Sequence, residues 1–130
     1  MKRRLVLICL ALICGLTLLF VVSHSTEKTF DIKGVTRIAV MSGSTGKNVD
    51  ITDQDLIQQI TDNISSIRFK RGSRINSSGW SYNIRWYDAD GQEIENITTG
   101  ANGTNLFYDG YNWSAVSGSI DTMLLDGVLG

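Results

Sequence analysis

The chain has 130 residues, of which 42% are hydrophobic and 19% are charged, and this length suits one domain with one core. Without its first 22 residues it keeps nine basic and thirteen acidic residues, a net charge of −4, which argues against nucleic-acid binding. The only histidine is His24, and both cysteines, Cys9 and Cys14, lie in the apolar N-terminal segment. The remaining sequence therefore predicts no disulfide, no histidine-based metal site and no cofactor.

Residues 1–22 have the composition of an export signal or a membrane anchor. Three basic residues precede an apolar run over 5–22, which as a helix would measure about 27 Å against a hydrocarbon core of about 30 Å. That length leaves open a retained anchor that contacts the membrane through residues 5–22, or a cleaved signal. Either alternative places the rest of the chain outside the cytoplasm, on the cell membrane or secreted.

A polar spacer over 23–33 precedes a domain that we assign to residues 34–130. Its first elements are an apolar, β-branched strand over 35–41 and an alternating strand over 47–51. The Ser/Gly-rich residues between them predict a turn, so the two strands should form a hairpin.

The clearest helix follows over residues 53–63. Thr52 is a suitable N-cap, and acidic residues occupy the first turn, where the helix dipole favours them. Apolar residues recur at helical spacing at Leu56, Ile57, Ile60 and Ile64. A short strand over 67–71 and a polar, mobile loop over 72–79 are expected next.

The second half of the domain reads as consecutive strands. The strand over 80–87 is the strongest, and one of its faces carries Trp80, Tyr82, Ile84 and Trp86. Gly-containing turns then separate strands over 93–99, 105–108 and 111–116, and Asp121 should cap a short helix to Leu125. The predicted class is α+β: an N-terminal membrane or signal helix, then an antiparallel sheet with one main helix packed on one face.

Tyr108, Tyr111 and Trp113 gather around the turn Asp109-Gly110 and are the candidate binding residues. They could form a sugar- or peptide-binding surface, or they could complete the core. Four cations lie close together earlier in the chain, and a solvated strand end is the simpler interpretation for them: Arg68, Lys70, Arg71 and Arg74.

No arrangement of residues predicts catalysis. Glu93 and Glu95 share a strand face and are interpreted as solvated rather than as an acid–base pair. The function predicted first is therefore a non-enzymatic binding or interaction module at the cell surface, with a protein or a cell-wall polymer as ligand. The alternatives are a small carboxylate-based cell-wall hydrolase, or an inhibitor or sensor accessory domain that docks on a partner protein.

Six short pieces occur together in the chain: SGSTGK (42–47), ITD (51–53), NISSIRFK (63–70), GWSY (79–82), WYD (86–88) and YDGY (108–111). Together they resemble a family of small exported proteins of Gram-positive bacteria whose function is unknown. The resemblance implies an exported, compact domain and assigns no catalytic residue. Many members are lipoproteins, and this chain departs from them because Ile13 fits poorly before a lipidated Cys14.

Overall fold

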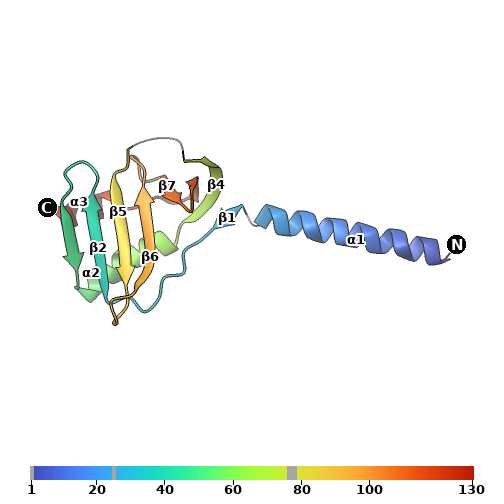
Figure 1. The fold of residues 1–130 in the computed structure, drawn as a ribbon, viewed down its shortest axis with the longest axis horizontal. Coiled ribbons are helices and arrows are strands. Elements are labelled where there is room, and N and C mark those ends of the chain that lie inside the picture. Colours follow the sequence, from blue (N-terminus) through green and yellow to red (C-terminus); the bar gives the residue numbers. More distant parts are fainter. Residues whose placement is uncertain (1, 25, 76–78) are drawn as a thin grey trace.

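The computed structural model describes residues 2–24, 26–75 and 79–130, with side chains for 2–16, 26–75 and 79–130. Three helices and eight strands make up this described part (Figure 1). The helices are α1 (Lys2–His24), α2 (Gln54–Ser65) and α3 (Thr122–Leu129). The strands are β1 (Glu27–Lys28), β2 (Arg37–Ser42), β3 (Asn48–Ile51), β4 (Arg68–Arg74), β5 (Tyr82–Tyr87), β6 (Glu93–Thr99), β7 (Asn105–Tyr108) and β8 (Tyr111–Ser117).

All eight strands belong to one antiparallel sheet in the order β1-β4-β8-β7-β6-β5-β2-β3. The pairing between β6 and β7 is short, because only Thr98 and Thr99 of β6 have partners in β7. Figure 1 shows β2, β5 and β6 side by side, with β7 at an angle to them. The sheet therefore has two parts, β3-β2-β5-β6 and β7-β8-β4-β1, joined through this short contact.

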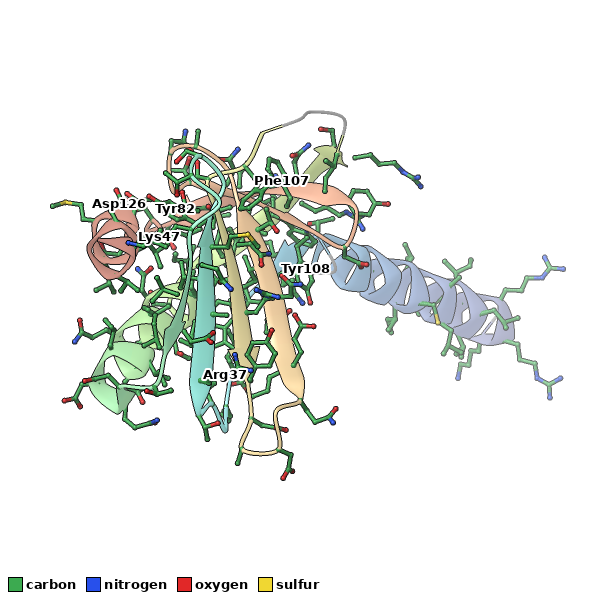
Figure 2. The ribbon with its side chains drawn as sticks, turned by 60° about the vertical axis from the view of Figure 1, so that its left-hand side comes forward. Arg37, Lys47, Tyr82, Phe107, Tyr108 and Asp126 are labelled. Atoms are coloured by element: carbon green, nitrogen blue, oxygen red, sulfur yellow. The ribbon has the colours of Figure 1, made fainter. Side chains whose placement is uncertain are left out.

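The core lies between the sheet and two helices on the same face of it. Ile57, Ile60 and Ile64 of α2 are buried, and so are Leu125 and Leu129 of α3. Figure 2 shows both helices on one side of β2 and β5. Burial alternates along β5, as a one-sided sheet requires, whereas β2 buries Ile38, Ala39 and Val40 in succession. The buried residues of the sheet include Ile38, Val40, Ile84, Trp86, Ile97 and Leu106.

The predicted architecture is wrong as stated. The described chain is dominated by an eight-stranded sheet with three helices, rather than by a sheet under one main helix. The short helix expected from Asp121 to Leu125 is longer in the structure, where it is α3. Its buried residues Leu125 and Leu129 make it a second helix packed on the core. Among the residues that the structure describes, no helix has both the length and the hydropathy needed to cross a membrane, so the expected N-terminal membrane helix is not supported.

Most individual elements lie where the sequence predicts them; besides the extension of α3 to Leu129, four differences are seen. Asp53, not Thr52, caps α2, because its carboxylate accepts the backbone N–H of Leu56. Trp80 lies outside β5 and is 39% exposed, so the buried face of that strand begins at Tyr82. The expected loop over 72–79 begins later, since β4 continues to Arg74; residues 76–78 lie outside the described part.

The fourth difference is β1, which lies inside the expected polar spacer. Its two residues pair with Lys70 and Phe69 of β4, and Phe30 just after it is buried. The ring of Phe30 meets that of Phe69 edge to face, at 5.9 Å between centroids. The segment after α1 is therefore part of the domain.

Candidate functional site

The three predicted aromatic residues come together on one face of the β7–β8 hairpin. Asp109 and Gly110 both have positive φ, 52° and 80°, the conformation of a two-residue turn that matches the twist of its strands. This turn places Tyr108 directly opposite Tyr111. Trp113 lies two residues beyond Tyr111 and so projects to the same face. The local sequence alone produces this cluster.

A hollow of about 250 Å³ opens over the cluster. Trp113 is its floor: the side chain is buried, and its indole N–H donates to the carbonyl of Tyr108 at 2.9 Å. Tyr108 and Tyr111 are half-buried and keep part of their rings accessible. Of the two alternatives considered for these residues, Trp113 completes the core, whereas the two tyrosines line the wall of the hollow. The hollow is lined by Glu27, Lys28, Arg71, Tyr108, Asp109, Tyr111 and Trp113.

Cations from β1 and β4 lie over the two tyrosine rings. Lys28 Nζ is 4.9 Å from the centroid of the Tyr108 ring. The guanidinium carbons of Arg71 and Arg74 are 4.9 Å and 5.9 Å from the centroid of Tyr111. In the described part of the chain none of these three cations forms an ion pair with a carboxylate. Their charges are therefore available to an anionic group.

A second hollow, of about 510 Å³, adjoins the first. The two share the lining residues Lys28, Tyr108 and Asp109 at the end of β7, and we refer to them together as the groove. Phe107 and Tyr108, labelled in Figure 2, both line the second hollow. Its other lining residues, Asn96 and Thr98, offer hydrogen-bonding groups beside these rings.

Tyr108 is held as a neutral phenol. Burial first, then a hydrogen bond to Glu95 and the negative charges of Glu95 and Asp109, together raise its pKa to about 12. Glu95 was expected on a solvated strand face, but it is half-buried and engaged by this phenol, while Glu93 is exposed. The two carboxylates therefore differ in environment, and Glu95 supports the wall of the groove.

The other hollows lie elsewhere. One of about 480 Å³ lies between residues 31–35 and α2. A smaller one, about 190 Å³, is lined in part by Tyr82 and Asp126. The hydroxyl of Tyr82 donates a hydrogen bond to Asp126 of α3, and the two side chains face each other in Figure 2. No group of three or more metal-ligating side chains occurs in the described residues.

The sequence predicts that Tyr108 and Tyr111 lie together, but it does not predict that Lys28 and Arg71 lie over their rings. Lys28 belongs to a strand of two residues in an apparently polar spacer, and Arg71 lies in a basic stretch interpreted as solvated. Only the pairing of β1 with β4, and of β4 with β8, brings Lys28 and Arg71 to the hairpin. No local pattern indicates these two long-range pairings.

Comparison of the chain with protein-family models, with curated proteins and with solved structures finds no match. The resemblance to exported Gram-positive proteins therefore stays a prediction, and the function rests on the geometry of the groove.

Proposed function

We propose that residues 26–130 form an exported, non-enzymatic binding module whose ligand lies in the groove over Tyr108 and Tyr111. The observation that carries this proposal is the pairing of each half-buried tyrosine ring with a cation that has no carboxylate partner in the described part of the chain. Aromatic faces give contact area at a small cost in side-chain entropy, and unpaired cations add attraction and orientation. The ligand is a protein segment or a polymer at the cell surface.

A carboxylate-based hydrolase is less well supported. Such enzymes need two carboxyl groups that face the substrate from opposite sides. Here Glu95 is hydrogen-bonded to Tyr108, and Glu93 lies exposed on the strand. An accessory domain that docks on a partner remains compatible with the groove and differs from the proposal only in the identity of the ligand.

Retention assays test the groove directly. The purified full chain is immobilised and exposed to solubilised cell-surface proteins and to wall fragments, and bound material is quantified. Tyr111→Ala should remove most of the retention, whereas Tyr111→Phe should keep it because the ring remains. Tyr87→Ala is the matched control, since Tyr87 is also half-buried beneath an arginine, Arg37, at 4.0 Å, in the other part of the sheet. Equal retention by Tyr111→Ala and wild type would refute the groove as the site.

Export is proposed on the basis of the basic and apolar residues over 1–22. Fractionation of cells and the mass of the mature protein test it. A product that begins after residue 22 in the medium, or an intact chain outside the cytoplasm, supports export. An intact chain confined to the cytoplasm refutes it.

A further inference from the structure

The second hollow of the groove opens where the two parts of the sheet separate. β7 pairs with β6 at Thr98 and Thr99 alone, so residues 93–97 of β6 have no partner in β7. Side chains from both strands line the hollow, which measures about 510 Å³. This volume lies within the range of small-molecule sites, about 300–1,000 Å³.

Hydrogen bonds hold the two side chains that β6 contributes. The amide nitrogen of Asn83, on β5, donates to Oδ1 of Asn96 at 2.8 Å and to Oγ1 of Thr98 at 3.0 Å. Asn96 therefore keeps its own NH₂ group, and Thr98 keeps its hydroxyl hydrogen. Within the described residues neither group donates to the protein, so both are donors held in position beside the hollow.

An uncovered aromatic ring lies next to these donors. Phe107 is directly opposite Thr98 in the β6–β7 pair and is half-buried. In the part of the chain that the structure describes, no cation and no other ring lies over Phe107, whereas Tyr108 meets both Lys28 and Phe30. The accessible part of the Phe107 ring is therefore free to stack on a ligand.

We infer that this second hollow binds a sugar ring of a cell-surface polysaccharide. The inference rests on the proposed function and names the ligand class of the same groove. A pyranose has a face of C–H groups, which suits the face of Phe107, and hydroxyls around its edge that each donate and accept. The hollow supplies both kinds of partner: Asn96, Thr98 and Lys28 donate, and the carboxylate of Asp109 accepts.

A sugar fits these groups better than a protein side chain does. An apolar side chain packed on Phe107 would cover the donors of Asn96 and Thr98 and leave them without partners, at a cost in free energy. Hydroxyls on neighbouring carbon atoms can satisfy several such groups at once. The first hollow shares Tyr108 with the second, so the next sugar of the polymer reaches the ring of Tyr111.

The probe is a wall polysaccharide from the cells that produce the chain, digested exhaustively with protease and labelled with a fluorophore. Its binding to the full chain is followed by anisotropy. The digested polysaccharide should bind, and polyglutamate, which carries charge without sugar rings, should not displace it. Loss of binding on protease treatment, or displacement by polyglutamate, would overturn the inference.

Variants locate the sugar. Asn96→Asp keeps the oxygen that accepts from Asn83 but removes the NH₂ donor, so polysaccharide binding should weaken about tenfold. Asn48→Asp adds the same charge at an exposed position on β3 and should bind like wild type. Phe107→Ala should weaken binding by a similar factor, about tenfold, whereas Phe107→Tyr keeps the ring and the binding.

Melting temperatures establish that these four variants fold. The side-chain amide signals of Asn96 should also shift in NMR spectra when the polysaccharide is added, and those of Asn48 should not. Unchanged binding by Asn96→Asp or by Phe107→Ala would overturn the inference.

Failure of the inference can be distinguished from failure of the proposed function. If the digested polysaccharide does not bind but Tyr111→Ala still loses retention of cell-surface material, the sugar is wrong and the groove stands. If Phe107→Ala loses the polysaccharide and Tyr111→Ala loses nothing, the sugar site stands and the site over the two tyrosines is wrong.

Discussion

The indole nitrogen of Trp86, on β5, donates a 3.1 Å hydrogen bond to Oγ1 of Thr61, on α2. Trp86 is fully buried and Thr61 nearly so. The bond therefore gives the largest core side chain its only polar contact within the described residues and fixes the position of the helix relative to the sheet.

Thr61→Val should destabilise the domain by about 1–3 kcal/mol, because it leaves the Trp86 N–H buried without an acceptor. Thr61→Ser keeps the hydroxyl and should cost less. Trp86→Ala removes the ring as well and should cost about 3–5 kcal/mol. Urea unfolding measures all three. A cost of Trp86→Ala below about 1 kcal/mol would mean that this ring does not hold the core.

Alkaline pH should destabilise the fold through Tyr82. Burial, then the hydrogen bond to Asp126 and the charge of that residue, raise the pKa of Tyr82 from 10.0 to about 12. Below about pH 10 the phenol is protonated in both the folded and the unfolded chain, so its contribution is complete. Between about pH 10 and pH 12 only the unfolded chain loses the proton, so stability falls and the contribution is lost above that range. Urea unfolding between about pH 9 and pH 12 measures the decline.

Tyr82→Phe is the control for this decline. It removes the titrating group, so its stability should fall less steeply over the same range, although burial of Tyr108 raises the pKa of that second phenol to about 12 as well. The double variant Tyr82→Phe/Tyr108→Phe should therefore have the flattest profile. If the free energy of unfolding fell equally steeply with pH in the wild type and the double variant, the assignment of the decline to these two phenols would be contradicted.

Residues 26–130 should fold without the N-terminal helix. Among the side chains that the structure describes, the buried core extends from Phe30 to Leu129, and this part of the chain contains no cysteine. One core of this kind should unfold in a single cooperative transition that reducing agent does not affect. Calorimetry of the isolated segment measures this, and a transition without cooperativity would show that the segment 2–24 contributes to the fold.

Substitution by alanine should change the stability of the domain in opposite directions at two glycines, Gly110 and Gly127. Gly110, in the β7–β8 turn, has a φ of 80°, which alanine adopts only at a cost of about 1–3 kcal/mol. Gly127 lies within α3, and an added Cβ there meets no atom within 4 Å, so Gly127→Ala should stabilise by about 0.5–1 kcal/mol. Urea unfolding gives both signs, and destabilisation by Gly127→Ala would indicate crowding at α3.

The elements that could be predicted are those defined by neighbouring residues. Alternation over 82–87 and the Asp109-Gly110 dipeptide are sufficient to specify β5 and the β7–β8 hairpin. Thr52 and Asp53 are both good caps, so the sequence could not decide between them. β1 could not be predicted at all, because a strand of two residues exists only through β4. Because of the same dependence, nothing in the sequence indicated Lys28, one of the three cations over the tyrosine rings.

The place of β4 in the strand order also governs when the domain can form. β4 joins the sheet only through β8, which pairs Phe69 with Ala115, and β1 joins only through β4. A ribosome must therefore synthesise the chain as far as β8, near its end, before β4 and β1 can join the rest of the sheet. Until then β1 and β4 can pair only with each other, and the core around Phe69 stays incomplete.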